Sequence, residues 1–152
     1  MSLSFQFSLQ KILDLRSRLE QEAGAELSRL KSLEAEAEEK LALQRQQRKV
    51  ELDTWRNKIQ GQLDLSELDA CHRWLEKLDD AIARQQAIVE ELRLAVERQT
   101  EEFLAARQKR KVLERLREHE YTRFWQEFLR KEQRELDDLA ATRYVQREAS
   151  SS

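Results

Sequence analysis

The side chains best suited to chemistry in this sequence are one cysteine and two histidines: Cys71, His72 and His119. A cysteine beside a histidine could form a nucleophile and base pair or supply two metal ligands. Adjacent residues do not face each other on a helix, however, and the pair has no evident third partner. His119 lies between two glutamates and is expected to be solvated. The sequence therefore predicts no catalytic residue, no metal site and no cofactor.

The strongest basic patch covers residues 107–117, with six basic residues and one acidic residue. Such a patch could bind nucleic acid or an acidic protein surface. The alternative is a solvated helix face that Glu20, Glu22 and Glu26 partly neutralise. The whole chain carries a net charge of −2, which argues against nucleic acid as the main partner.

Three tryptophans stand out in so polar a chain. Trp55 and Trp74 are expected to face each other, within about two helical turns of the bend between two helices. They would either lock this end as an aromatic cap or form a docking patch, because tryptophan is enriched at protein interfaces. The third, Trp125, falls among other aromatic residues near the C-terminus.

The composition indicates which elements hold these side chains. The 152 residues include no proline and two glycines, and 38% of them are charged. Proline and glycine are the usual residues of turns, and a chain rich in Ala, Glu, Lys, Leu and Arg is typical of a coiled coil. Disorder is the alternative, but the small net charge and the apolar periodicity argue against it outside the last residues.

Neither the N-terminus nor the interior of the chain predicts secretion or insertion into a membrane. The N-terminus lacks a basic region followed by an apolar one, and no apolar run is long enough to span a bilayer. A lone cysteine fits a reducing compartment. The sequence thus predicts a soluble, cytoplasmic protein.

Two apolar seams predict an all-α fold, a long antiparallel two-helix coiled-coil hairpin. The second seam, from Leu75 to Leu113, alternates steps of three and four residues, the repeat that keeps one face on a partner helix. Gly61 is expected to end the first helix in a left-handed conformation, and Ser66 with Asp69 resembles a capping box. The predicted single domain has helix 1 at about 5–60, a turn at about 61–66, helix 2 at about 67–147 and a disordered tail at 148–152.

Folding the sequence about Leu63 sets the predicted register. Phe103 then faces Ala23, and Val89 faces Ala37, so that a large side chain meets a small one. Three seam positions are polar, and a polar residue in a seam fixes register at some cost in stability. These are Gln85, Gln99 and Arg110.

Helix 2 is predicted to be longer than helix 1, so its end extends beyond the pairing. Folding about Leu63 places Phe5 and Phe7 beside Tyr121 and His119, where they would cover part of this end. The uncovered aromatic residues would need a partner. They are Phe124, Trp125 and Phe128.

Three segments, in order along nearly the whole chain, resemble the FliJ family of flagellar type III export stalk proteins. The opening Phe5-x-Phe7-x-Leu9-Gln10-x-x-Leu13-x-x-Arg16 is similar to that family's first motif. Residues 74–82, WLEKLDDAI, resemble its segment at the start of the second helix, and residues 132–140, EQRELDDLA, resemble its closing stretch.

The resemblance implies a stalk similar to the central stalk of rotary ATPases. Such a stalk inserts the open end of its hairpin into the hexameric flagellar export ATPase and stimulates it. Its turn-proximal face meets the cytoplasmic domain of the export gate, and it engages export chaperones. It would lie in the cytoplasm, peripheral at the inner membrane through the export apparatus and without inserting into the membrane.

The family's contact residues carry over by position. The resemblance implies ATPase-facing residues, to which the overhanging aromatic residues are added: Phe5, Phe7, Leu9, Gln10, Phe124, Phe128, Glu132, Gln133 and Asp137. The gate-facing set would be Trp55, Trp74, Leu78, Ala81 and Gln85. Family members often have Tyr or Phe in place of the two tryptophans, and a His near Gln85.

Two alternatives remain open at this point. One is the equivalent stalk of a virulence-type type III secretion system. The other is a structural coiled coil that homodimerises through the overhang, which would double the mass in solution. A nucleic-acid-binding arm would instead be retained on heparin and released by salt.

Overall fold

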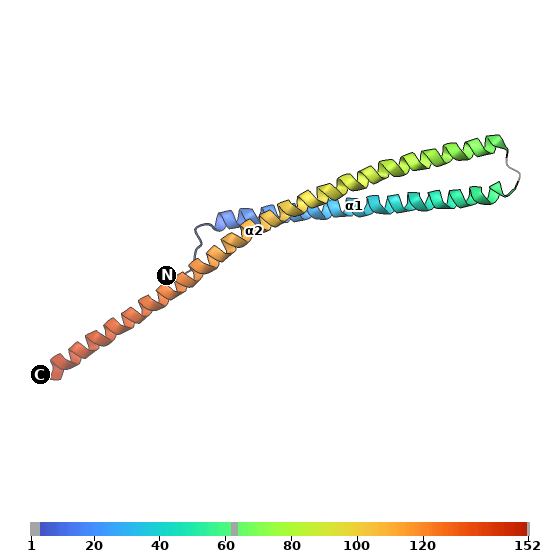
Figure 1. Cartoon of the computed structure of the whole chain (residues 1–152). Helices are drawn as coiled ribbons and strands as arrows, with labels where there is room; N and C mark the ends of the chain where they lie inside the picture. The colour runs from blue at the N-terminus through green and yellow to red at the C-terminus, as the bar shows by residue number, and fades with distance from the viewer. Residues whose placement is uncertain (1–3, 62–63, 152) are drawn as a thin grey trace. The chain divides into compact units, whose positions relative to one another are not determined.

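The computed structural model describes residues 4–61 and 64–151, and these form two long α-helices (Figure 1). Helix α1, Gln10–Ile59, has 50 residues, and helix α2, Leu65–Ser151, has 87. The described part of the chain contains no β-strand. The helices pack against each other in opposite directions, which confirms the all-α hairpin. Neither described helix has a stretch apolar enough to cross a membrane.

The contacts group the chain into two units, Glu20–Ala105 and a second one made of Met1–Leu19 with Ala106–Ser152. In the first unit, antiparallel pairing brings the middle of α1 against α2. Ala37, Leu41 and Val89 form its buried apolar cluster, 5–8% exposed, and Ile82 and Leu92 pack against them. A two-helix seam is narrow, so no large side chain among the described residues is completely buried.

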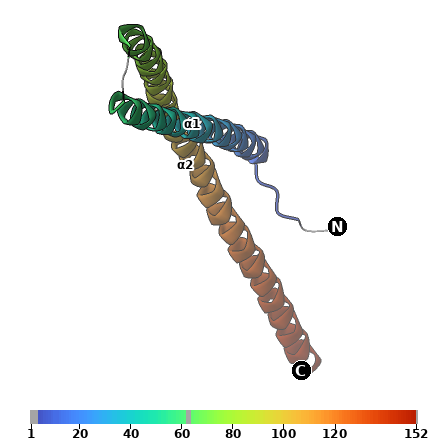
Figure 2. The same ribbon diagram turned by 90° about the vertical axis from the view of Figure 1, so that its right-hand side faces the viewer.

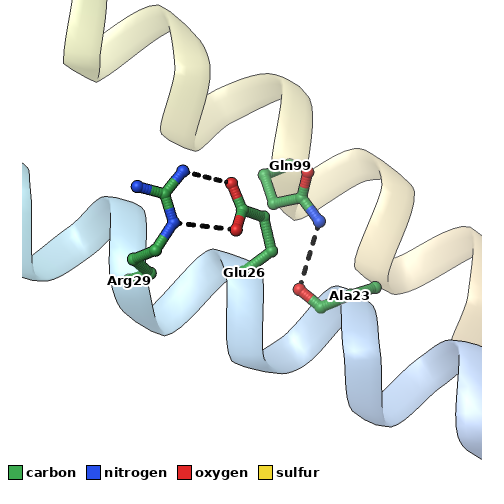
Figure 3. Close-up of polar contacts among 4 residues, drawn as sticks. All are labelled: Ala23, Glu26, Arg29 and Gln99. Carbon is green, nitrogen blue, oxygen red and sulfur yellow. Dashed lines mark hydrogen bonds and ion pairs between the residues drawn. The ribbon is translucent and has the colours of Figure 1, made fainter.

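Two glutamines of α2 cross this seam. Gln85 is only 4% exposed, and its Nε2 donates to the Ala37 carbonyl at 3.0 Å. The Gln99 Nε2 donates to the Ala23 carbonyl at 3.1 Å (Figure 3). The two glutamines are two heptads apart along α2, and the two alanines are two heptads apart along α1. Each acceptor is the carbonyl of an alanine, whose small side chain lets the glutamine reach the backbone. The predicted polar seam is confirmed at these two positions.

The pairing near Phe103 agrees with the predicted register to within one residue. A Cβ placed on Gly24 would lie 3.2 Å from the Phe103 ring carbon Cε2. Phe103 therefore packs on the glycine next to Ala23, its predicted partner. The absence of a side chain at Gly24 makes room for the ring.

The helix ends at the turn differ from the prediction. Asp64, rather than Ser66, precedes α2: its carbonyl accepts from the amides of Glu67 and Leu68 at 3.1 and 3.2 Å. The Ser66 hydroxyl lies inside the helix and donates to the Asp64 carboxylate at 3.2 Å. An aspartate at the cap is favoured by the helix dipole, so the helix begins earlier than predicted.

Gly61 does not adopt the predicted left-handed conformation, because the structure has no glycine with positive φ among its described residues. Its amide donates to the Lys58 carbonyl at 3.0 Å, which closes a tight last turn. Gln62 and Leu63, the predicted centre of the turn, lie outside the described residues.

In the second unit, helix 1 starts at Gln10 and not at about residue 5. Residues 4–9 are non-helical (Figure 2). The Phe7 side chain is buried, 7% exposed, and the Phe7 carbonyl accepts from the Gln10 amide at 3.1 Å. Burial of this aromatic side chain outweighs the small gain from about one more helical turn.

The C-terminal tail also differs from the prediction, because α2 continues as a helix through Ser151. Residues 129–151 are all exposed, and no other described segment of this unit lies beside them in Figures 1 and 2. Local bonds support the helix there, such as Gln133 Nε2 donating to Asp137 at 3.1 Å, four residues on.

Candidate partner-binding sites

Aromatic residues gather where α1 begins and α2 continues, within the second unit. We call Phe5, Tyr121, Phe124, Trp125 and Phe128 the aromatic cluster. The Phe5 ring meets Tyr121 edge to face with centroids 5.2 Å apart, and lies 5.7 Å from the Phe124 ring. On α2, Trp125 contacts Phe124 and Phe128 at 5.6 and 5.5 Å. These spacings are typical of favourable aromatic pairs, and the predicted contact of Phe5 with Tyr121 is confirmed.

Arg117 of α2 also contacts the N-terminal segment. Its guanidinium carbon lies 5.9 Å from the Phe5 ring centroid, and its Nε donates to the Gln10 side-chain oxygen at 3.1 Å. One side chain of α2 therefore contacts both the segment before α1 and the first residue of α1. Arg117 was not among the predicted site residues, although folding the sequence about Leu63 sets it opposite Leu9.

The cluster is only partly covered. Phe5, Phe124 and Phe128 are partly buried, whereas Tyr121 and Trp125 are 47% and 39% exposed. Beyond them, residues 129–151, the single-helix end, expose more apolar side chains, including Leu129, Leu136 and Leu139 at 57–63%. Positions 125, 129, 136 and 139 fall on one side of a helix, so an apolar stripe continues from the cluster along the single-helix end.

The predicted ATPase-facing residues divide into two groups. One group packs at the start of α1, with Phe7 buried and Phe5, Leu9 and Gln10 partly buried. The other group lies on α2, and its polar members are exposed: Glu132, Gln133 and Asp137. The structure places Phe5 of the first group in the aromatic cluster, and it leaves the polar residues of the second group beyond that cluster on the single-helix end.

Near the turn, Trp55 and Trp74 do not form an aromatic ring pair like those found among the other described residues. Trp55 is partly buried, and the Lys58 ammonium lies 5.0 Å from its ring centroid. Trp74 is 42% exposed. A cavity of about 160 Å³ adjoins Trp55, and its lining includes Ile59, Leu68, Cys71, His72 and Leu75. The aromatic cap predicted for this end is therefore not formed as a pair of rings.

The other predicted gate-facing residues lie deeper in the seam. Leu78 is 8% and Gln85 4% exposed, whereas Ala81 is partly buried. A partner could touch Trp74 and part of Ala81 without opening the hairpin. Leu78 and Gln85 are buried between the helices and are not accessible to such a partner.

Cys71 and His72 differ in accessibility, as expected for neighbours on a helix. The Cys71 thiol is buried, and His72 is exposed. Across residues 4–61 and 64–151, no three His, Cys, Asp or Glu side chains gather closely enough to hold a metal ion.

Charged residues make local pairs on the helix surfaces. In the basic patch, Arg110 pairs with Glu114 at 2.7 Å. On α1, Glu26 accepts two bonds from Arg29 at 2.6 and 2.9 Å (Figure 3). These bonds from Arg29 hold the Glu26 pKa below its ordinary value.

The chain is similar to one known protein family along nearly its whole length. Residues 5–149 match the family described as flagellar FliJ protein. No curated protein and no solved structure matches the chain. The matched region begins at Phe5 and includes both helices, the aromatic cluster and most of the single-helix end. The chain therefore belongs to the FliJ family of flagellar proteins.

Proposed function

We propose that this chain is a non-catalytic stalk of the flagellar protein export apparatus, which binds the hexameric export ATPase through its aromatic cluster and single-helix end and stimulates ATP hydrolysis. Family membership supports a role in flagellar export, and in the flagellar rather than the virulence-type system. The stalk itself would contribute no catalytic group, because the ATPase supplies the hydrolysis.

The observation that carries the proposal is the exposed apolar stripe on a helix without a partner. A single helix in water gains little from its own hydrogen bonds, and most helical stability in proteins comes from packing. Leu129, Leu136 and Leu139 are nevertheless exposed on one side of this helix. A ring of subunits around it would bury this stripe and contact the polar residues Glu132, Gln133 and Asp137.

The stalk would act by differential binding. A ligand shifts a conformational equilibrium only as far as it binds one state better than the other. A helix contacting the subunits of a ring unequally would favour one arrangement of their interfaces. Stimulation should therefore saturate with the amount of added stalk.

The decisive experiment measures ATP turnover by the hexameric flagellar export ATPase against increasing amounts of stalk. The full chain should stimulate turnover, and a chain ending at Lys131 should not. The removed residues that the structure describes, 132–151, are all exposed, so circular dichroism and urea unfolding should show the rest of the hairpin intact. Full stimulation by the shortened chain would overturn the proposal.

The second partner we propose is the cytoplasmic domain of the export gate, bound near the turn. The observation that favours it is Trp74, 42% exposed on a helix whose next inward residue, Leu78, is buried. Trp74→Ala should weaken gate binding and leave ATPase stimulation unchanged. If gate binding were unaffected, the turn-proximal site would be wrong and the ATPase site would stand.

Chaperones remain a proposed third class of partner, for which no particular surface is assigned. The competing possibility, a homodimer through the single-helix end, makes a different prediction. Sedimentation equilibrium should give the mass of one chain, 18.2 kDa. A stable dimer that dissociates when residues 132–152 are removed would favour the structural coiled coil.

A further inference from the structure

The two grooves that flank the helix pair between residues 33 and 45 of α1 and 85 and 95 of α2 differ in chemistry. One groove, of about 580 Å³, is mainly apolar. Its apolar lining is Leu33, Ala37, Ile88, Leu92 and Ala95. The other, of about 460 Å³, is lined by four charged residues among its eight. These are Glu38, Arg45, Glu90 and Arg93.

The apolar groove has the spacing that receives a third helix. On α2, Ile88, Leu92 and Ala95 follow one another by four and three residues, which is the pattern of a helix-in-groove contact. Ile88 is 45% and Leu33 36% exposed, so both project at the rim. At the floor, Ala37 is small and the Gln85 side chain turns inward to the Ala37 carbonyl, so neither side chain projects into the groove.

The charged residues that line the groove indicate which charge a bound molecule should carry. Three charged residues line the apolar groove, two acidic and one basic: Glu36, Glu91 and Lys40. Neither Glu36 nor Glu91 makes an ion pair with any described residue. In the charged groove, by contrast, Glu90 already pairs with Arg93 at 3.1 Å.

We propose that the apolar groove binds an amphipathic helix of another protein, with an apolar face flanked by lysines or arginines, so that three helices pack together at this point. The apolar face would cover Leu33, Ile88 and Leu92, and the basic flanks would meet Glu36 and Glu91. Such a site is separate from the aromatic cluster and from Trp74, and it does not depend on ATPase stimulation.

The test uses the full chain and a fluorescein-labelled helical peptide of about five turns, built from Leu, Ala and Lys, with leucines on one face and lysines on both flanks. Two control peptides have glutamate in place of lysine, or the same composition in scrambled order. Fluorescence anisotropy at physiological salt should show saturable binding of the first peptide alone.

Matched variants locate the site. Glu91→Lys should lower the affinity about tenfold, which corresponds to one lost, well-placed charge contact. Glu90→Lys changes the same charge one residue away, in the other groove, and should change the affinity less than about twofold. Likewise, Ile88→Gln should weaken binding. Leu94→Gln should not, because Leu94 lines neither groove, although its exposure of 41% is close to that of Ile88.

Three results would overturn the proposal. The first is an equal loss of peptide affinity with Glu90→Lys and Glu91→Lys, which would mean that the peptide is attracted by the overall negative charge of the chain. The second is no saturable binding of the amphipathic peptide to a chain that circular dichroism shows to be folded. The third is a dimer in solution that Ile88→Gln dissociates, because a second copy would then occupy the groove. ATPase stimulation should be the same for all four variants.

Discussion

Residues 20–105 and the single-helix end have similar leucine-rich, highly charged sequences, and the structure treats them in opposite ways. In the first region Leu27, Leu41 and Leu78 are at most 9% exposed. In the second, Leu129, Leu136 and Leu139 are 57–63% exposed. A leucine contributes stability only where a partner helix removes it from water. The paired region is therefore built for stability, and the single-helix end has apolar surface available for another molecule.

The sharpest test of this contrast makes the same substitution in both regions. Leu41→Ala should lower the free energy of unfolding by about 2–3 kcal/mol, since it opens a cavity beside Val89 and Ala37 in a narrow seam. Leu136→Ala should change it by less than about 0.5 kcal/mol, because the side chain is already in water. Urea unfolding followed by circular dichroism measures both. Equal losses would show that the single-helix end is buried in solution.

The next largest effect is expected at the buried glutamine. Gln85→Ala should destabilise the chain by about 1–2 kcal/mol through the lost hydrogen bond and the space left behind. Replacing Gln85 and Gln99 together with leucine should cost less, but it should weaken the choice of register. Amide NMR spectra should then show more than one set of signals for residues 20–105. A single set would mean that the apolar seam alone fixes the register.

A smaller effect is expected at Gly24, where helix propensity and packing oppose each other. Alanine is better than glycine inside a helix by about 1 kcal/mol, but the added Cβ would lie 3.2 Å from the Phe103 ring. Phe103 is only partly buried, so its ring can shift, and we expect Gly24→Ala to be slightly stabilising. In a Phe103→Leu background the gain should approach the full propensity difference. Marked destabilisation in the native background would show that the ring is held rigidly.

The smallest effect concerns the exposed pair of Glu26 and Arg29. Bonds from Arg29 lower the Glu26 pKa from its ordinary 4.5. A carboxylate whose folded pKa is depressed stabilises the fold above its unfolded pKa, and this contribution disappears as the pH falls through the folded pKa. NMR titration of the Glu26 carboxyl carbon should show the low value, and Arg29→Gln should raise it towards normal. If Arg29→Gln left the Glu26 pKa unchanged, the ion pair with Arg29 would not be the cause of the lowered pKa.

The sequence was sufficient to predict the hairpin because its evidence is repetitive. About twenty apolar residues follow the three-four spacing in the two seams, at 9–59 and 75–113, so an error at one position does not alter the register. Local features had no such redundancy. The caps at Gly61 and Ser66 were each predicted from one or two residues, and Asp64, the better cap, was overlooked.

The candidate sites were predicted less completely than the fold. The contact of Phe5 with Tyr121 followed from the register, and family resemblance supplied the polar residues near Glu132. The roles of these residues remain predictions. The seam that runs from Leu75 to Leu113 includes Leu78 and Gln85, whereas the family resemblance assigned both residues to a binding face. The structure buries both in the seam.

The sequence by itself determined the helices, their antiparallel order and the family, because these depend on periodicity and on residues in a fixed order along the chain. The tertiary structure decided where Phe7 is buried, how far α2 continues, and which of the two grooves is apolar. Each of these depends on the rotation of one helix against another, and a seam pattern fixes that rotation only approximately. A small rotation exchanges a rim residue for a floor residue, so Ile88 and Glu91 acquire their neighbours only in the folded pair.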